Sequence, residues 1–581
     1  MINASKDYLK SFFNGNLQYE VPFFQRAYIW NEENWEILWE NVFDVFQDYL
    51  NQINNEHFIG TLIIKQRPAQ LLGDNIYDLV DGQQRLTTFA ILLKTLADTC
   101  QNTLPRLKEK IMELIVFENA RGQKFIRIIH NHVDKPYFEK ILSNDLNTIE
   151  TQLGNSENKI AQAYFYFLEK VKDLEDEHRD ILKDLILNKV PIISMLISAE
   201  DDEQEIFDTI NSLGVKLTTA ELLKNYIFKE SELRPLYPSH WNSIYEIDEE
   251  RIDFWNKDKT SGRVIRTNVE ILLYCYLIIQ TRKEVKLEKL YKEYKAWLTG
   301  QTIESKITFL ETLKAYAEIY YNFPEGEELN EFEFSEYEKR FFHIIENLSI
   351  TTVYPLVLFL YNEIPEPEER REYLEFLESY LVRRNICKLT TKNYNNLFLS
   401  ILQRLIDFQN EAEGLTLGKF KNIFYEYDDE TNLFPSDDML KESFHNSILT
   451  NQNAKEILYC IELNNKDNDL TDVKKLSSTN YSVEHILPKK WEGNWMDREM
   501  TETKKSIRNK KLLTLGNLTL LTKKLNSTLK NNSWDIKKDT LLQYSSLRIT
   551  TEYINLDAWN EETIESRAND LFNVAKEIWE R

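Results

Sequence analysis

The clearest pattern of apolar and polar positions near the N-terminus is that of a strand, a turn and a helix. The run Ile76 to Val80 is strand-like, and the turn signal Asp81-Gly82 follows it directly. Apolar residues then recur at helical spacing, at Leu86, Phe89, Ala90, Leu93, Leu96 and Ala97. We therefore predict a strand that ends at Val80 and a helix that begins just after Gly82.

Helical patterns dominate the next part of the chain. A helix is predicted to end at Leu213, with Gly214 as its stop. Thr218 and Glu221 have the spacing of a capping box, so a second helix is predicted to run through AELLKNYIF, which ends at Phe228. These features are explained by helix chemistry alone.

Residues 231 to about 400 carry long amphipathic stretches, which predict a helical bundle. Breaks in the pattern fall near Pro235, Gly262, Pro324 and Pro365 to Pro367. The segment from Glu411 to about Ser478 is polar and acidic, and we interpret it as a loop or an insertion.

Composition supports a folded, α-rich protein. The 581 residues are 42% hydrophobic and 29% charged, which excludes a largely disordered chain, and their number suggests about three to four domains. Only 14 Gly and 13 Pro are present, which favours long helices with short connections.

Several classes of protein are excluded or disfavoured. The longest apolar run, Ile271 to Ile279, is far shorter than the ~20 residues of a membrane-spanning helix. The first residues do not resemble a secretory signal, so we expect a cytoplasmic protein. Four cysteines occur without a CxxC pair, which disfavours disulfides and thiolate zinc and predicts buried thiols; they are Cys100, Cys275, Cys387 and Cys460.

Charge is distributed unevenly along the chain. The formal net charge of −24 argues against a nucleic-acid partner, but residues 484 to 548 contain 14 Lys or Arg and 7 Asp or Glu, a local charge of +7. The remainder of the chain therefore carries −31. This basic window suits a polyanion, although a solvated basic helix face would look the same.

A first group of residues that could bind a ligand surrounds the predicted turn. An Asp-Gly turn that leads through Gln83 and Gln84 to Arg85 would place backbone N–H groups, amides and a guanidinium at the positive end of a helix, a geometry that suits phosphate. The alternative is an ordinary turn in which Arg85 pairs with a carboxylate. The candidate nucleotide-binding residues are Gln25, Arg26, Asp81, Gly82, Gln83, Gln84 and Arg85.

A second constellation lies inside the basic window. His485 follows Glu484 in a short run that Pro488 stops, Asn517 lies in a later apolar run, and Asn526 falls on a predicted helix. Glu484 and Asn526 could hold Mg²⁺ or Mn²⁺ through oxygen while His485 takes a proton from water. The alternative is a satisfied core histidine. Neighbouring strand residues face opposite ways, so Glu484 and His485 can share a metal site only if the strand ends or bends there.

Together these segments resemble a known family. The chain contains PFFQR, DGQQRLTT, INSLGVKLTTAELLKNYIF, YLVRRNICKLTTKNYN, EHILP and LGNLTLLTKKLN. This combination resembles the GmrSD-like type IV, modification-dependent restriction enzymes and their relatives that sense phosphorothioated DNA. The resemblance implies an N-terminal domain similar to the ParB and sulfiredoxin fold, which binds and hydrolyses a nucleoside triphosphate, either GTP or ATP, through DGQQR.

The resemblance also implies a C-terminal HNH nuclease domain of the ββα-metal type, with Mg²⁺ or Mn²⁺ as cofactor. His485 matches the general base, Asn517 the middle residue of the motif and Asn526 the last. Phosphate contacts to double-stranded, modified DNA are expected from lysines of the basic window. These are Lys489, Lys490, Lys504, Lys505, Lys510, Lys511, Lys523 and Lys524.

The expected fold class is therefore α-rich α+β. We expect a ParB-like domain over residues 1–230, a helical region over 231–410 and the HNH domain over 411–581. The expected function is NTP-regulated DNA cleavage in defence against phage. Two alternatives stay open at this point: a nuclease that attacks host or unmodified DNA to abort infection, and a non-catalytic ParB-like switch that binds DNA. Association into a homo-oligomer also stays open.

Overall fold

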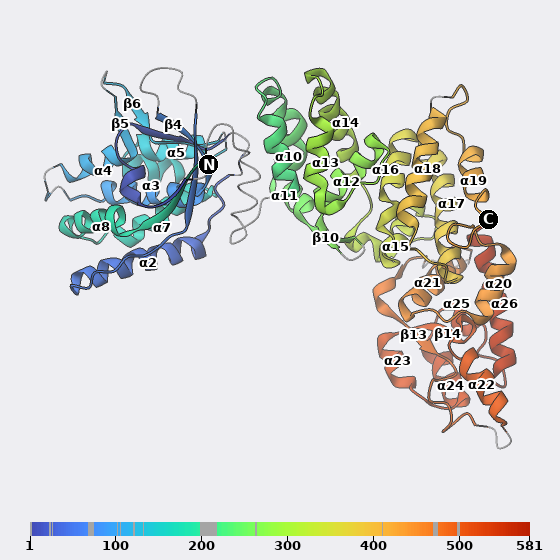
Figure 1. The fold of residues 1–581 in the computed structure, drawn as a ribbon. Coiled ribbons are helices and arrows are strands. Elements are labelled where there is room, and N and C mark those ends of the chain that lie inside the picture. Colours follow the sequence, from blue (N-terminus) through green and yellow to red (C-terminus); the bar gives the residue numbers. More distant parts are fainter. Residues whose placement is uncertain are drawn as a thin grey trace. The chain divides into compact units, whose positions relative to one another are not determined.

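The fold is described from a computed structural model, in which two compact units divide between Arg234 and Pro235. Each unit is described by itself (Figure 1). The described residues are 3–22, 25, 27–67, 75–101, 103–104, 106–119, 122–131, 133–197, 218–261, 264–409, 411–468, 474–496 and 500–581.

A mixed six-stranded sheet organises the N-terminal unit, with the strand order β1-β8-β3-β4-β2-β7. The strands β1 and β8 pair antiparallel, as do β3 and β4, and the remaining neighbours are parallel. The bounds are β1 Asn3–Tyr8, β2 Leu17–Glu20, β3 Thr61–Gln66, β4 Asn75–Asp81, β7 Ile128–Ile129 and β8 Pro191–Ile197, beside a separate hairpin of β5 Val116–Glu118 and β6 Lys124–Ile126.

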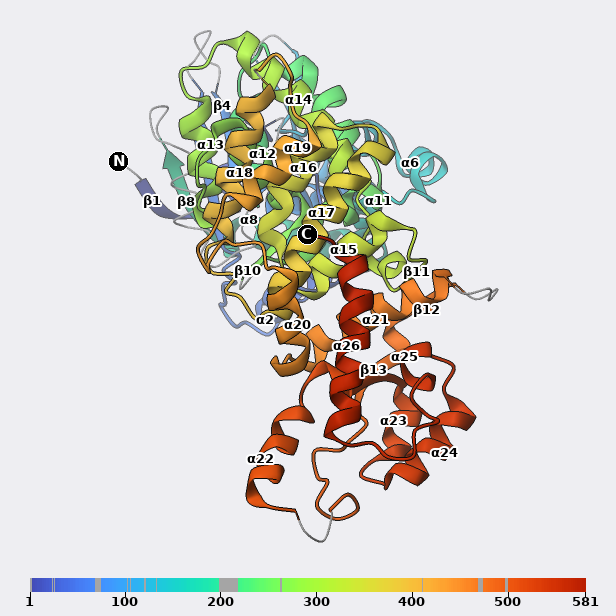
Figure 2. The same ribbon diagram turned by 90° about the vertical axis from the view of Figure 1, so that its right-hand side faces the viewer.

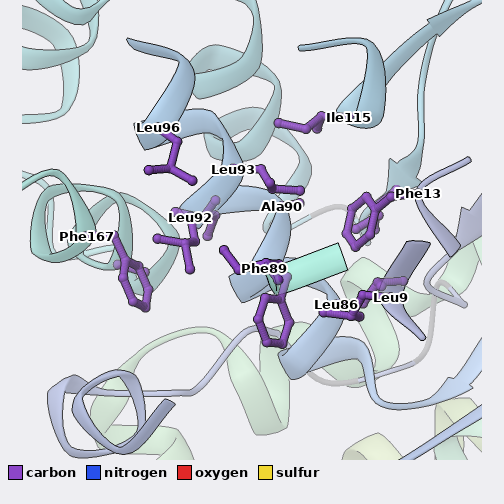
Figure 3. Close-up of a cluster of buried hydrophobic side chains, with 14 of the residues drawn as sticks. Leu9, Phe13, Leu86, Phe89, Ala90, Leu92, Leu93, Leu96, Ile115 and Phe167 are labelled. Carbon is purple, nitrogen blue, oxygen red and sulfur yellow. The ribbon is translucent and has the colours of Figure 1, made fainter. Parts of the chain in front are cut away.

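Helix α3 (Gln83–Asp98) forms the centre of this unit. Every apolar position that the sequence pattern assigned to it is buried, which confirms the predicted strand, turn and helix. Figure 3 shows Leu86 to Leu96 surrounded by Leu9, Phe13, Ile115 and Phe167 from other elements. The surrounding helices are α1 Leu9–Phe12, α2 Glu32–Leu50, α4 Leu107–Ile115, α5 Lys135–Ser143, α6 Leu146–Leu153, α7 Lys159–Val171 and α8 Asp176–Lys189.

The unit ends with helix α10 (Thr219–Phe228). Its capping box is present as predicted: Thr218 Oγ1 accepts from the N–H of Glu221, and the Glu221 carboxylate accepts from the N–H of Thr218. The preceding helix that we predicted to end at Leu213, with its stop at Gly214, lies outside the described residues.

Helices make up most of the second unit, as the amphipathic pattern predicts. Their bounds are α11 Glu249–Asn256, α12 Asn268–Thr281, α13 Leu290–Leu298, α14 Ile303–Tyr321, α15 Tyr337–Asn347, α16 Tyr354–Glu363, α17 Pro367–Ile386, α18 Tyr394–Gln409, α19 Leu417–Tyr425, α20 Asp437–Asn446, α21 Asn451–Asn468, α22 Glu502–Lys511, α23 Lys523–Leu529, α24 Trp534–Tyr544, α25 Arg548–Thr551 and α26 Glu561–Ile578. Short strands interrupt them, namely β9 Asp258–Ser261, β10 Val264–Thr267, β11 Glu331–Phe332, β12 Leu476–Ser477, β13 Tyr481–His485 and β14 Leu518–Thr522.

The α-rich α+β fold class is thus confirmed, but one segment was interpreted wrongly. The polar stretch after Glu411 is not a loop: its described residues contain α19, α20 and the long helix α21. Leu440 and Phe444 are fully buried, as are Leu458 and Ile461. Apolar residues three or four positions apart are enough to bury one side of each helix, even though the composition of the segment is polar.

One hydrophobic core joins the helices before residue 411 to those after it. It contains Ile344, Val382 and Ile386 from α15 and α17, together with residues of α20, α21, β14 and α26. Helix α26 passes beside α20, α21 and α22 (Figure 2). The domain boundary at residue 410 remains a prediction, since this core contains residues from both sides of it.

The motif YLVRRNICKLTTKNYN lies around the end of α17, and its two arginines are buried. Arg383 donates to the carbonyl oxygens of Trp579 and Pro435 and pairs with Asp437 at 2.7 Å. Arg384 donates to the carbonyl oxygens of Leu433, Thr390 and Thr431. These contacts give the arginine pair a structural role, because they satisfy backbone groups of irregular segments.

The four cysteines are free thiols, of which Cys275 and Cys460 are buried and Cys100 and Cys387 half-buried. Burial raises the pKa of each of these thiols. Among the helices in the described part of the chain, none is both long and apolar enough to cross a membrane.

Gly82 provides a test of how α3 begins. It has a φ of 89°, and a Cβ there would lie 2.6 Å from Cδ1 of Leu62 and 3.1 Å from the carbonyl oxygen of Thr61. Gly82→Ala should therefore lower the free energy of unfolding by about 1–3 kcal/mol more than Gly15→Ala. Gly15 is the matched control, because its φ is 62° and nothing lies within 4 Å of its Cβ position. Equal losses in chemical denaturation would contradict this account.

Candidate functional site

The DGQQR segment spans the junction of β4 and α3, so it lies at the start of a buried helix. Asp81 is the last residue of β4, and Gly82 is the N-cap in the left-handed conformation. As a glycine, this N-cap residue has no side chain that could cap the first turn of α3. The backbone N–H groups there are therefore candidates to bind an anion, as predicted from the sequence.

Arg85 and Asp81 are brought together at this junction. The guanidinium lies 3.8 Å from the carboxylate of Asp81 and donates to the carbonyl oxygen of Thr61 at 3.0 Å. Thr61 Oγ1 donates in turn to Asp81 at 3.2 Å. A Cβ on Gly60 would lie 3.2 Å from the guanidinium, so this glycine leaves room for it. Arg85 keeps 30% of its side chain exposed and can reach a ligand from a fixed position.

The glutamines of the constellation attach the segment of residues 25–30 to the motif. Gln84 Oε1 accepts from the N–H groups of Ile29 and Trp30, and Gln84 Nε2 donates to the carbonyl oxygen of Ala27. Gln25 Nε2 donates to the carbonyl oxygen of Val80 at 3.0 Å. Gln83 is buried, and Arg26 lies outside the described residues. The amides thus hold the two candidate segments side by side.

Sequence reasoning missed Asn131 and Asp134, which form hydrogen bonds to the backbone of Gln25 and Tyr28. Asn131 Nδ2 donates to the carbonyl oxygen of Gln25, and Asp134 accepts from the N–H of Tyr28 at 2.7 Å. Burial raises the pKa of Asp134 to about 6, while the hydrogen bond from Tyr28 opposes the rise. Neither residue carries a local signal, because each acts through a contact about 106 positions away in the sequence.

The second constellation is built on a hairpin followed by a helix. The strands β13 and β14 pair antiparallel from Tyr481↔Thr522 to His485↔Leu518, without a break in register, and α23 begins directly after β14. His485 is therefore the last residue of its strand, and Asn526 lies on the following helix, as predicted. The order strand, strand, helix is the one expected of a ββα nuclease site.

Asn517 precedes β14, is fully buried and is hydrogen-bonded on every side. Its Oδ1 accepts from the N–H of Leu487 at 2.8 Å and from Trp559 Nε1 at 2.9 Å. Its Nδ2 donates to the carbonyl oxygens of Leu487 and Leu512, both at 2.8 Å. This side chain fixes the residues that follow His485, and its geometry is that of a positioning residue. The adjacent Gly516 is needed because a Cβ there would overlap the carbonyl oxygen of Ile564.

His485 is half-buried at the end of the hairpin. Burial, with the positive charges of Lys489 and Lys537 adding to the effect, lowers the pKa of His485 to about 4. The imidazole is therefore neutral near pH 7, which is the protonation state that a general base requires.

Glu484 is held by a lysine that sequence reasoning missed. Lys537 on α24 is fully buried, and its Nζ donates to Glu484 Oε1 at 2.6 Å and to the carbonyl oxygen of His485 at 2.9 Å. Burial raises the pKa of Glu484 and lowers that of Lys537, and the attraction between the two groups opposes both shifts. Nothing in the sequence around Lys537 distinguishes it from the exposed lysines of the basic window.

Asn526 lies across the hairpin, where its Nδ2 donates to Ser482 Oγ at 2.9 Å and to the carbonyl oxygen of Val483 at 3.1 Å. Ser482 and Glu484 share one face of β13, whereas His485 belongs to the other by strand alternation. The register with β14 is unbroken as far as His485, where the strand ends.

The donors around the hairpin suit a hard divalent cation in part. The carboxylate of Glu484 and the amide oxygen of Asn526 are ligands of the type that Mg²⁺ and Mn²⁺ prefer. The carboxylate, however, is already paired with the ammonium of Lys537. Within the described ranges, no three His, Cys, Asp or Glu side chains gather in a way that could hold a metal ion.

The candidate DNA-binding lysines differ in their exposure and in their ion pairs. Six of the eight are exposed, namely Lys489, Lys490, Lys504, Lys510, Lys523 and Lys524. Lys505 pairs with Glu502 at 2.7 Å, and Lys511 pairs with Glu565 at 3.1 Å and donates to the carbonyl oxygen of His445. The exposed six are the better candidates for phosphate contacts.

Comparison with known proteins gives two matches. Residues 9–228 match the N-terminal domain of the GmrSD restriction endonucleases, and residues 434–574 match the C-terminal domain of the same enzymes. A search of curated proteins finds no match. The two matches span both candidate sites and define a restriction endonuclease. The chain belongs to the GmrSD restriction endonuclease family.

The role of Asn517 can be tested by stability. Asn517→Ala would leave four buried hydrogen-bonding partners unsatisfied, so we expect a loss of at least about 3 kcal/mol in the free energy of unfolding. Asn526→Ala is the matched control and should cost about 1 kcal/mol, because that amide is only half-buried. Thermal and chemical denaturation of both variants would measure the difference. Similar losses would show that Asn517 does not hold the site together.

Proposed function

We propose that the chain is an NTP-regulated, divalent-metal-dependent HNH endonuclease that cleaves modified double-stranded DNA in defence against phage. Membership of the restriction endonuclease family supports DNA as the substrate. The observation that carries the proposal is a neutral imidazole, His485, at the end of a strand–strand–helix element whose final helix carries Asn526.

In the proposed reaction, His485 accepts a proton from the water that attacks the scissile phosphodiester. A pKa near 4 keeps the imidazole unprotonated at neutral pH, so it is ready to act as a base. Asn517 holds the backbone of Leu487 and thereby orients the end of β13. The exposed lysines of the basic window bind backbone phosphates without sequence preference.

Glu484 and Asn526 would hold the divalent cation. A cation bound there would neutralise charge that develops on the phosphate during cleavage. The carboxylate and the amide belong to different elements, β13 and α23, so the hairpin and the helix must keep their packing for both to contribute.

Nucleotide binding is proposed for the junction of β4 and α3, within a ParB-like domain over residues 1–230. Arg85 supports this proposal because its guanidinium is partly exposed, is held by the carbonyl oxygen of Thr61 and lies in the first turn of a helix whose N-cap is a glycine. Asp81, Gly82, Gln83 and Gln84 complete the proposed site, while the amides of Gln84 and Gln25 keep its second segment in place.

Cleavage of plasmid DNA separates this function from its alternatives. The design compares modified with unmodified plasmid, with and without Mg²⁺ and each nucleotide. Cleavage of modified DNA alone supports the proposal, and cleavage of unmodified DNA favours the abortive-infection nuclease. DNA binding without cleavage in any condition would leave a ParB-like switch as the function.

His485→Ala should lower the rate of cleavage by roughly 10²–10⁴-fold, because the group that takes the proton is removed. The melting temperature should change little, since His485 is only half-buried. His445→Ala is a matched control, in which a half-buried histidine that contacts Asn569 is removed from the same unit. Cleavage that survives His485→Ala would contradict the HNH assignment.

Arg85→Ala should weaken nucleotide binding roughly 10- to 100-fold, the cost of one charge-assisted hydrogen bond to a phosphate. Calorimetry with GTP and ATP measures the affinity directly. Arg67→Ala serves as the control, because Arg67 follows the neighbouring strand β3 but pairs with Glu20 and Asp78. If both variants bind nucleotide as the wild type does, the nucleotide site lies elsewhere.

A further inference from the structure

Lys537 makes two contacts at the proposed nuclease site. A single ammonium contacts the carboxylate of Glu484 and the carbonyl oxygen of His485, so it bridges the two neighbouring residues of the EHILP motif. The lysine comes from α24, which follows the ββα element in the sequence and is not part of it. Its side chain is fully buried, so its position is set by the packing around it.

Burial strengthens the attraction between Lys537 and Glu484. Two buried opposite charges attract each other more than they would in water, and each would be costly to bury without the other. Glu484 keeps 14% of its side chain exposed, so this side chain is not closed off from solvent. The ammonium of Lys537 therefore occupies the same carboxylate that a metal from solvent would use.

A divalent cation at Glu484 would meet this positive charge directly. Two cations that share one carboxylate repel each other, and little water is present to screen a fully buried ammonium. Asn526 cannot compensate by turning, because its amide nitrogen is held by Ser482 and Val483. The affinity of the site for a metal must then depend on how strongly Lys537 holds Glu484.

We propose that Lys537 is a positioning residue of the nuclease site. Its ammonium binds the Glu484 carboxylate and competes with the divalent metal for that carboxylate. This inference rests on the proposed HNH function. The inference goes beyond that function because it assigns the control of metal affinity to a residue outside the HNH motif. Metal binding and the release of Lys537 from Glu484 are then two sides of one exchange.

Binding of Mn²⁺ to the full-length protein tests the exchange without relying on cleavage. Free Mn²⁺ is measured by electron paramagnetic resonance for the wild type and for Lys537→Gln, Lys538→Gln and the double variant Glu484→Gln/Lys537→Gln. Lys538 is the matched control, because it is the next residue on α24 and donates to the carbonyl oxygen of Leu556. Each variant that removes one lysine changes the net charge by the same amount.

We expect Lys537→Gln to bind Mn²⁺ about fivefold or more tightly than the wild type, the lower end of typical coupling between two ligands. Lys538→Gln should bind as the wild type does, and the double variant should lose the gain because the carboxylate is gone. Unchanged or weaker binding by a folded Lys537→Gln would overturn the inference. Absence of Mn²⁺ binding in every protein would overturn the metal site of the proposed function, and the inference with it.

A measurement on the wild type covers the case in which Lys537→Gln does not fold. Lysines are acetylated with a succinimidyl ester, and the extent at each position is read by mass spectrometry with and without saturating Mg²⁺. Lys537 should be protected without metal and more reactive with it, because exchange frees the ammonium from Glu484. Protection of Lys537 that stays the same while Mg²⁺ is bound would overturn the competition.

Discussion

The amide of Asn517 makes the hydrogen bonds on which the geometry of the proposed nuclease site depends. A single buried side chain joins the residues after His485, the end of α22 at Leu512 and the indole of Trp559. Leu487 and Leu512 lie just beyond the ends of β13 and α22. Since a buried polar group without a partner is costly, the amide both satisfies them and fixes their relative positions. Asn517 thus helps to orient His485 through the backbone that follows it, while both of its own amide atoms are used in hydrogen bonds within the protein.

Buried guanidinium groups have a similar function elsewhere. Arg567 donates to the carbonyl oxygens of Leu515, Gly516, Leu518 and Ile549, beneath the turn that carries Asn517. Arg127 donates to those of Asn14, Gly15, Leu17 and Leu114 in the N-terminal unit. Burial lowers the pKa of each to about 10, so both remain charged at neutral pH. In each case several backbone carbonyl oxygens of irregular segments converge on one fork of donors.

The local sequence pattern predicts some of the helices, strands and caps, but it does not predict contacts between distant segments. The start of α3, the capping box at Thr218 and the short strand that carries His485 follow from periodicity and turn residues close together in the sequence. Helices α19 to α21 were missed because average polarity hid the spacing of a few buried side chains. Lys537 and Asp134 could not be found, since each matters only through a contact with a distant segment.

The shared core of the second unit has a consequence for how the nuclease region can be handled. Trp579, near the end of α26, donates to Glu378 of α17, and Arg383 of the same helix donates to the carbonyl oxygen of Trp579. A fragment cut at residue 411 would leave this indole and the apolar faces of α20 and α21 without their cover. Such a piece would tend to aggregate in isolation. The helices before residue 411 thus complete the core on which the C-terminal region depends.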